Sequence, residues 1–347
     1  DDHAERSILT LTMDRLGEGS LTKLAEDCPT SHSIEPRAPD DIAVIVYTSG
    51  TTGLPKGAMI SHNNLISNAQ TLTSAWGWTR ADVMLHTLPI FHVHGLFVGL
   101  HLPLLTGSAM IFQPSFEAAA VRTALAHATV FMGVPTYYTR LLSQGIHQKD
   151  CEGMRLFISG SAPLLAQTFQ DWEAATGTVI LERYGMSETG MNTANPLDGA
   201  RKPGTVGPPL PGVECLVVND AGDVLPVGET GHLWVRGPNV FQGYWQNVEK
   251  TAESFTPDGY FKTGDLAVID DEGYISIVGR SKDLIITGGL NVYPKEIELV
   301  LDAIDGVMES AVIGLPHPDF GESVCAVIVS LPEVDLTPEF IFDQIKT

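Results

Sequence analysis

The chain has 347 residues, and its 42 acidic against 20 basic side chains give a formal net charge of −22 at pH 7. This excess of negative charge repels nucleic acid and anionic membrane surfaces, so we expect neither as a partner. Four widely spaced cysteines without a C-x-x-C pair indicate neither a disulfide framework nor a structural zinc site. No apolar run is long enough to span a bilayer and the first residues lack the pattern of a signal peptide, which together predict a cytoplasmic protein.

The length predicts two or three domains. Within the first 40 residues, the apolar alternation at 8–13 predicts one strand. Pro29, Pro36 and Pro39 then predict a linker.

A glycine- and hydroxyl-rich loop follows the linker. Residues 42–46 are a continuous β-branched run that predicts a buried strand, and Ser61 can cap a helix after the loop. The loop offers backbone N–H groups, hydroxyls and one cation, from Thr48, Ser49, Gly50, Thr51, Thr52, Gly53 and Lys56. This inventory suits a polyphosphate. The loop is not a Walker motif, because Lys56 is preceded by proline and followed by glycine.

Short apolar strands then alternate with helical patterns as far as residue 200. The strands are expected at residues 82–89, 108–112, 129–134 and 155–159. Such alternation predicts βαβ units and a mostly parallel sheet with ligand-binding loops at the carboxyl ends of its strands. His92 and His94 stand two residues apart after the first of these strands, but no cysteine or carboxylate lies nearby, so we do not expect a metal site there.

The next strand ends in a loop with several functional side chains. This loop, residues 184–189, has the sequence Tyr-Gly-Met-Ser-Glu-Thr. Its aromatic ring can stack on a base, and Glu188 can hold a magnesium ion. Alone, the loop is equally explained by a helix cap at Ser187 with Glu188 favoured by the helix dipole.

From Gly204 the pattern changes to short strands separated by glycine turns, which predicts a small β-barrel or sheet. Near its end, Asp265 follows a tight Thr-Gly turn. Its carboxylate can accept hydrogen bonds from the two hydroxyls of a ribose, although an aspartate in this position is more often only a turn residue.

Three segments together, residues 47–57, 184–189 and 273–298, closely resemble the signatures of the adenylate-forming (ANL) superfamily, which contains acyl-CoA synthetases, luciferases and peptide-synthetase adenylation domains. The resemblance implies an α/β fold: a large N-terminal domain with mostly parallel sheets flanked by helices and a small β-barrel, then a small α+β C-terminal domain. The expected boundaries are 1–281 for the AMP-binding domain, with its βαβ sheet region at 40–200 and its β-rich subdomain at 204–280, and 282–347 for the start of the mobile domain.

The same resemblance assigns roles to individual residues. Catalytic roles fall to Lys56, His92, Glu188 and Thr189, with Glu188 also holding Mg²⁺. Nucleotide and coenzyme A contacts are implied, besides the phosphate loop, for Gly160, Ser161, Ala162, Glu182, Arg183, Tyr184, Gly185, Met186, Ser187, Asp265, Arg280, Lys282, Gly288 and Gly289. Lys282 marks the hinge between the domains. Substrate-side positions are His94, Ser159 and Met191.

Two arginines narrow the choice of acid. Arg155 precedes the adenine-side strand and Arg201 follows the 184–189 loop; a monocarboxylic acid gains nothing from a guanidinium, whereas a dicarboxylic acid supplies its partner. The surrounding strings resemble malonyl-CoA synthetases. We therefore predict an acid–thiol ligase that uses malonate, ATP and coenzyme A. The alternative is that both arginines are surface or interdomain charges, and Lys202 could take the place of Arg201.

Other readings stay open at this level: a ligase for another short carboxylic acid, or a nucleotide-binding module without ligase activity. A peptide-synthetase adenylation domain would need a carrier domain, which is not visible. Adenylating members carry a lysine in a late Gly-Lys pair, and no Gly-Lys dipeptide occurs here. With the N-terminal subdomain also missing, we expect a chain truncated at both ends. The sequence does not specify an oligomeric state.

Overall fold

The computed structural model describes residues 10–14, 16–31, 33–48, 55–287, 290–317, 320–331 and 334–345. The chain divides into an N-terminal unit, residues 1–38, and a main unit, residues 39–347. The N-terminal unit contains helix α1 (Ser20–Glu26), whose first hydroxyl accepts a hydrogen bond from the Thr12 N–H at 2.8 Å. The predicted strand at 8–13 is wrong in its described part, since residues 10–13 have no strand partner there.

A six-stranded sheet forms the centre of the main unit. Its strands are β3 (Val83–His86), β4 (Ala109–Phe112), β5 (Val130–Gly133), β6 (Leu156–Ser159), β7 (Ile180–Met186) and β8 (Gly190–Ala194). They lie in the order β4-β3-β5-β6-β7-β8, all parallel except the β7–β8 hairpin. The predicted mostly parallel sheet is confirmed.

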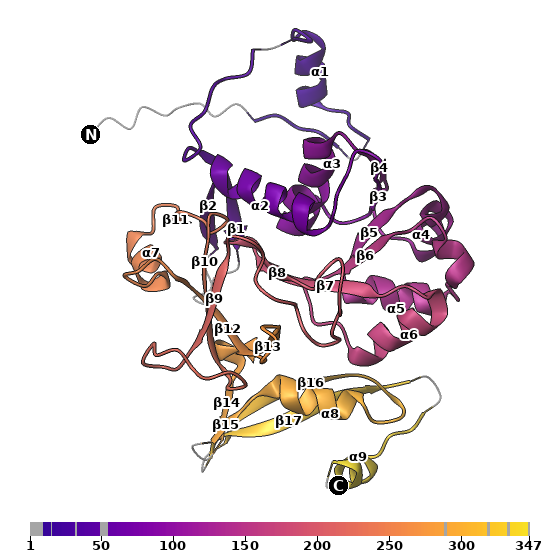
Figure 1. Cartoon of the computed structure of the whole chain (residues 1–347), viewed down its shortest axis with the longest axis vertical. Helices are drawn as coiled ribbons and strands as arrows, with labels where there is room; N and C mark the ends of the chain where they lie inside the picture. The colour runs from indigo at the N-terminus through magenta and orange to yellow at the C-terminus, as the bar shows by residue number, and fades with distance from the viewer. Residues whose placement is uncertain are drawn as a thin grey trace. The chain divides into compact units, whose positions relative to one another are not determined.

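Both faces of this sheet are covered, because alternate strand residues enter two separate cores. Leu85, Phe131 and Phe157 pack with helices α4 (Ala118–Ala124), α5 (Pro135–Ser143) and α6 (Ala166–Thr176). Met84, Met132 and Ile158 face the other core, which includes residues of α2 (His62–Ala75) and α3 (Leu100–Thr106). Figure 1 shows α5 and α6 side by side along the sheet. With both faces apolar, polar side chains are left to the ends of the strands.

The phosphate loop joins two antiparallel strands, not a strand and a helix. β1 (Ile42–Thr48) pairs with β2 (Lys56–Ser61), and β2 pairs with β11 (Gly243–Tyr244). The predicted strand at 42–46 is present, but the prediction that it is buried is wrong: β1 is an edge strand and only half-buried. The sequence at 57–60 was hard to assign because one glycine and three apolar residues are too short for a periodicity argument. The predicted cap is confirmed, since Ser61 and Asn64 exchange side chain–backbone hydrogen bonds of 3.1 and 2.9 Å.

The remaining elements form two antiparallel four-stranded sheets. The first, ordered β13-β12-β10-β9, contains β9 (Glu214–Val218), β10 (Gly231–Arg236), β12 (Phe261–Ile269) and β13 (Ile275–Arg280), with α7 (Val248–Ser254) nearby in sequence. The second, ordered β15-β14-β17-β16, contains β14 (Ile285–Thr287), β15 (Leu290–Val292), β16 (Val307–His317) and β17 (Gly321–Ser330), with α8 (Pro294–Asp302) and α9 (Pro338–Gln344). A β-rich region and an α+β region thus follow the parallel sheet, as the predicted fold class requires.

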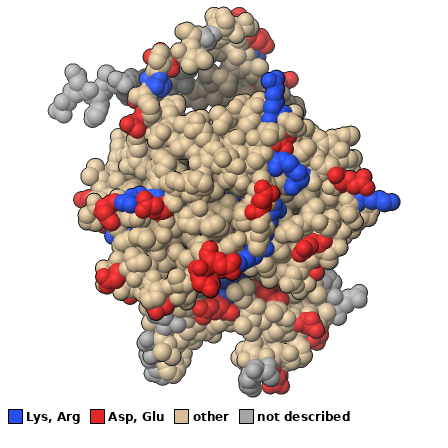
Figure 2. All heavy atoms as spheres, viewed as in Figure 1, with Lys and Arg blue, Asp and Glu red and all other residues tan. Residues whose placement is uncertain are grey.

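Acidic and basic side chains lie in several small mixed groups on the face seen in Figure 2. Among the ion pairs of the described residues, Lys202 Nζ lies 2.7 Å from Asp270 Oδ2 and 2.9 Å from Glu272 Oε1. In the part of the chain that the structure describes, no helix is long and apolar enough to cross a membrane.

Candidate active site

The carboxyl ends of the parallel strands bring together polar residues that are far apart in the sequence. β6 ends at Ser159 and continues into Gly160 and Ser161, while β7 carries Arg183 beside it. The π-helical segment η1 (His94–Gly99) adds His94. These five residues were all predicted site residues, and the structure places them in one neighbourhood.

Arg183 is a buried cation with few hydrogen-bond partners. Its residue is 3% exposed, and the side-chain atoms Nε and Nη2 have no hydrogen-bond partner among the described residues. The guanidinium lies against Gly160, where an added Cβ would be only 2.5 Å from Cζ. Burial lowers the pKa of Arg183 to about 10, so the group stays charged at neutral pH. A buried charge normally has a counterion, but no carboxylate of the described residues accepts a hydrogen bond from Nε or Nη2 of Arg183.

His94 is the second buried group at this end of the sheet. It is 6% exposed, its Nδ1 lies 3.2 Å from the Ser161 hydroxyl, and its Nε2 has no partner in the described structure. Burial, the positive charge of Arg183 and the neighbouring histidines lower the pKa of His94 well below 6.5, so the ring is neutral at pH 7. Ser161 adopts a φ of 71°, an uncommon value for a residue with a side chain, which here brings its hydroxyl to the imidazole.

Two buried polar residues here, Thr87 and His86, were missed by the sequence reasoning. Thr87 follows β3 with an Oγ1 that lacks a partner in the described part of the chain, as does Oγ of the predicted residue Ser159. His86, at the end of β3, is fully buried against Gly99 and stacked on Phe112 at 5.0 Å. Buried polar atoms nearly always have partners, so this group of unpaired atoms indicates a place for water or a small polar ligand. The signal available beforehand was two polar residues, 86 and 87, closing an apolar strand.

Glu188 lies beside Thr48, the last residue of β1, and is 8% exposed. Its Oε1 accepts hydrogen bonds from the Thr48 hydroxyl at 3.3 Å and from the Tyr244 phenol at 3.1 Å. The Lys56 ammonium lies 4.9 Å from the centre of the Tyr244 ring. Burial and the Glu188 carboxylate raise the pKa of Tyr244, which keeps the phenol protonated as a donor. Tyr244 was also missed, because a Gly-Tyr pair carries no motif by itself.

A magnesium ion fits Glu188 only as a partner of bound phosphates. The described residues contain no group of three or more His, Cys, Asp or Glu side chains arranged to hold a metal. Mg²⁺ is commonly bound by one or two carboxylates together with substrate phosphates and water. One buried carboxylate, beside Thr48 at the end of β1, meets that need.

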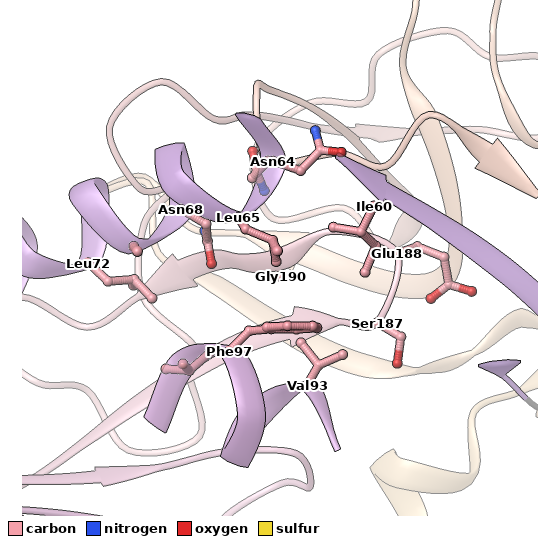
Figure 3. Close-up of a pocket in the computed structure, with 13 residues that line it drawn as sticks. Ile60, Asn64, Leu65, Asn68, Leu72, Val93, Phe97, Ser187, Glu188 and Gly190 are labelled. Atoms are coloured by element: carbon pink, nitrogen blue, oxygen red, sulfur yellow. The ribbon is translucent and has the colours of Figure 1, made fainter. Parts of the chain in front are cut away.

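A small cavity lies next to Glu188, between α2, η1 and the β7–β8 turn (Figure 3). Leu72 marks one end of it and Glu188 the other, with Val93 and Phe97 opposite the helix. Two lining asparagines are engaged: Asn64 donates to the carbonyls of residues 238 and 240, and Asn68 bonds the backbone of residue 191. The third, Asn239, donates to the Thr189 carbonyl, but its Oδ1 has no partner among the described residues.

The predicted ribose-binding pair is brought together on adjacent strands. Asp265 and Arg280 are register partners on β12 and β13, with Arg280 Nε 3.1 Å from Asp265 Oδ1. The Tyr184 hydroxyl donates to Asp265 Oδ2. Burial raises the pKa of Asp265, and the Tyr184 hydrogen bond and the Arg280 charge oppose that rise. Tyr184, Asp265 and Arg280 form one connected group, as the resemblance implies.

Arg155 and Arg201, predicted as substrate ligands, are not brought to this site. Arg155 precedes β6, and its Nε and Nη2 donate to the two carboxylate oxygens of Asp82 at 2.6 and 2.8 Å. Arg201 donates to the backbone carbonyls of Pro196, Val179 and Leu197. Both forks are filled by the chain itself, at the amino ends of β6 and β7. We correct the prediction accordingly; Lys202, the possible substitute, is paired with Asp270 and Glu272.

Several other predicted residues have structural contacts. The Thr189 hydroxyl accepts a hydrogen bond from Asn192 at 2.8 Å, and Met191 is buried. His92 is exposed beside Phe91, and Glu182 is buried with its pKa raised by burial to about 8. Gly185 and Met186 at the end of β7 and Ser187 in the following turn are half-buried, whereas Ala162 and Lys282 are exposed. The predicted positions Ser49, Gly50, Thr51, Thr52, Gly53, Gly288 and Gly289 lie outside the described residues.

Comparisons with known proteins agree on a family. Residues 1–245 match the family model described as AMP-binding enzyme. Malonate–CoA ligase of Arabidopsis thaliana is 45% identical over 314 residues, covering 84% of this chain and 51% of the relative. The mitochondrial malonate–CoA ligase ACSF3 of Mus musculus is 41% identical over 341 residues, covering 88% and 58%.

Among solved structures, ATP-bound MatB from Rhodopseudomonas palustris is 52% identical with a TM-score of 0.94, covering 97% of this chain and 67% of that one. The chain spans little more than half the length of the two curated relatives above. The family match covers well over half of the chain and includes β7, which carries Arg183, and the turn after it, which carries Glu188. The chain therefore belongs to the AMP-binding, adenylate-forming enzyme family.

Proposed function

We propose that this chain is the AMP-binding part of an ATP-dependent acid–CoA ligase that converts malonate, ATP and coenzyme A into malonyl-CoA, AMP and pyrophosphate. The observation that carries the proposal is Arg183. It is a fully buried guanidinium, beside the adenine-side turn at Gly160, whose Nε and Nη2 lack partners in the described structure. Malonate supplies the missing anion: one carboxylate reacts while the other binds Arg183.

The energetics favour a second anionic group on the acid. An unpaired buried charge costs several kcal/mol, and a carboxylate can accept two parallel hydrogen bonds from a guanidinium. A monocarboxylic acid would leave Arg183 unpaired and would place apolar carbons against it. Neutral His94 and the Ser161 hydroxyl can add hydrogen bonds without adding charge. The names of the plant and mouse relatives support the same acid.

The reaction then has two steps. One malonate oxygen attacks the α-phosphorus of ATP, forming malonyl-AMP and breaking the bond to pyrophosphate. The coenzyme A thiolate next attacks the carbonyl carbon and AMP leaves. Lys56 and the hydroxyls of its loop stabilise the phosphates, and Glu188 holds a position for Mg²⁺, which when bound neutralises phosphate charge. Tyr184, Asp265 and Arg280 would hold the nucleoside.

The wider organisation is proposed on the same basis. We assign residues 1–281 to the AMP-binding domain and 282–347 to the start of a mobile domain, with Lys282 at the hinge. The exposed position of Lys282 in the short turn 281–283 is compatible with that role. A cytoplasmic location stays a prediction; the mouse relative is named mitochondrial.

Acid-dependent pyrophosphate release tests the proposal. Malonate, methylmalonate, acetate, butyrate and benzoate are offered with ATP and Mg²⁺ to the full-length protein. We expect release with malonate at a kcat/KM at least tenfold above that for each monocarboxylic acid. Equal or better release with a monocarboxylic acid would contradict the malonate assignment, and ATP binding without release would leave only a nucleotide-binding module.

A further inference from the structure

Tyr244 stands between the two opposite charges of the phosphate site. Its hydroxyl donates to Glu188 Oε1 at 3.1 Å, and the Lys56 ammonium lies 4.9 Å from its ring centre. We propose that Tyr244 is a positioning residue that orients Glu188 for the metal of MgATP and holds Lys56 apart from it. This inference rests on the proposed function and assigns to Tyr244 a task that no recognised motif gave it.

The backbone fixes the ring from two directions. β11 pairs with β2 directly after the phosphate loop, with Tyr244 opposite Ala58 and the Trp245 N–H donating to the Gly57 carbonyl at 2.7 Å. On the other side, Phe241 packs edge-on against Tyr244 at 4.9 Å, and its N–H donates to the Glu188 carbonyl at 2.8 Å. Tyr244 is therefore tied both to the strand that carries Lys56 and to the backbone of Glu188.

The hydrogen bonds at Glu188 are one-sided. Thr48 and Tyr244 both donate to Oε1, so this oxygen is fixed by two donors, and neither of these bonds uses Oε2. A carboxylate with one oxygen fixed is oriented in advance for a cation at the other. Two neutral donors also leave the carboxylate negative, whereas a bond to Lys56 would neutralise it.

The Tyr244 ring holds the Lys56 ammonium away from the Glu188 carboxylate. A cation over an aromatic face is held by the ring quadrupole, and a phenol that donates to a carboxylate makes the ring more electron-rich. Among the described residues no ion pair joins Lys56 to Glu188; the ion pairs found involve other partners. Both charges thus stay available for ligands, Lys56 for phosphate and Glu188 for the metal.

The chain contains a matched arrangement without this property. The Tyr260 hydroxyl donates to Glu214 Oε2 at 2.7 Å, and the Arg236 guanidinium lies 4.4 Å from the Tyr260 ring centre. There, however, Arg236 Nη2 also contacts Glu214 Oε2 at 2.7 Å, so cation and anion are directly paired. In the Tyr260 group the basic side chain and the carboxylate therefore neutralise each other. The Tyr244 group also consists of a tyrosine, a glutamate and a basic residue, but its two charges are not paired with each other.

The test separates the two contacts of Tyr244. Binding of ATP is measured by titration calorimetry over a range of free Mg²⁺ for the wild type, Tyr244→Phe, Tyr244→Leu and the control Tyr260→Phe. Losing the phenol alone should raise the Mg²⁺ concentration for half-maximal ATP binding about tenfold, the usual scale for a hydrogen bond to a charged group. At saturating Mg²⁺, Tyr244→Phe should bind ATP within twofold of the wild type, because the ring remains under Lys56.

Tyr244→Leu should show the same Mg²⁺ shift and a further three- to tenfold loss of ATP affinity at saturating Mg²⁺. Thermal melting of each variant checks that it is folded. An unchanged Mg²⁺ requirement in Tyr244→Phe, or an equal shift in Tyr260→Phe, would overturn the inference. Neither readout involves the acid, so an absence of malonate-dependent pyrophosphate release would contradict the proposed function while leaving this result to be judged separately.

Discussion

The arginines at the two ends of the parallel sheet differ in how their guanidinium groups are paired. At the amino ends, Arg155 is held by both oxygens of Asp82 and Arg201 by three backbone carbonyls. At the carboxyl ends, Arg183 is more deeply buried and leaves Nε and Nη2 without partners in the described structure. An arginine whose fork is filled by its own chain stabilises the fold, whereas one with an empty fork is prepared for a ligand.

The contrast predicts that substitutions at the carboxyl end reduce activity and that those at the amino end reduce stability. The largest effect should come from Glu188→Ala. Removing one preorganised electrostatic group typically costs 10²–10³ in kcat, so we expect a loss of about a thousandfold in ATP-dependent pyrophosphate release. Exposed Glu152→Ala serves as the control. Turnover near the wild-type level in Glu188→Ala would remove this residue from the mechanism.

At the amino end, Arg155→Met should leave the Asp82 carboxylate buried without its partner. Because Arg155 is partly exposed and Asp82 keeps its hydrogen bonds from Thr79 and Thr129, we expect a loss of about 2 kcal/mol in the free energy of unfolding, to be measured by urea denaturation. Malonate kcat/KM of the folded variant should stay within twofold of the wild type. Arg80→Met, at an exposed position, is the matched control. A variant of unchanged stability that loses malonate activity would restore Arg155 as a substrate ligand.

A smaller effect is expected from Gly160→Ala, which adds a methyl group where the guanidinium lies. The new Cβ would be 2.5 Å from Arg183 Cζ, so the arginine must shift. We expect roughly a tenfold loss of malonate kcat/KM, about 1.4 kcal/mol, with ATP binding affected less. Gly153→Ala, where the nearest atom is a carbonyl oxygen at 3.4 Å, controls for the substitution itself. Equal losses in both variants would argue against the contact with Arg183.

The smallest effect concerns Glu182, which precedes Arg183 on β7 and projects to the opposite face of the strand. Burial raises its pKa from 4.5 to about 8, so the folded protein keeps a proton that the unfolded chain releases above pH 4.5. This stabilisation is complete below pH 4.5 and is lost as the pH rises toward 8. The slope is about 1 kcal/mol per pH unit.

Glu182→Gln should remove that slope, so the variant gains stability relative to the wild type between pH 5 and pH 7.5. Urea denaturation at several pH values measures it. Parallel pH dependences in the two proteins would mean that Glu182 is ionised in the folded state and could act as a counterion within the sheet.

Much of the fold was predictable, because βαβ alternation and turn glycines act over short stretches of sequence. The mostly parallel sheet, the β-rich region and the Ser61 cap all followed from local patterns. The β1–β2 hairpin did not, since residues 57–60 are too short for a periodicity argument, and the pairing of β2 with β11 joins segments almost two hundred residues apart. Pairing between distant strands leaves little trace in either strand alone.

The residues of the candidate site were easier to predict from the sequence than the role of each residue. The motif resemblance included Arg183, Glu188, Asp265 and Arg280, but the malonate ligands were assigned to Arg155 and Arg201. Sequence position could not tell which arginine finds an internal partner: Asp82 lies 73 residues before Arg155. Tyr244 was missed for the same reason, since its importance arises from contacts with Lys56 and Glu188.

The most direct test of the central claim compares Arg183→Met with Arg201→Met. The ratio of kcat/KM for malonate to that for butyrate is measured by pyrophosphate release in each variant and in the wild type. We predict that Arg183→Met lowers this ratio by about a hundredfold, near 2.7 kcal/mol, and that Arg201→Met leaves it within twofold. An unchanged ratio in Arg183→Met, or a collapse of the ratio in Arg201→Met, would contradict the assignment of the second carboxylate to Arg183.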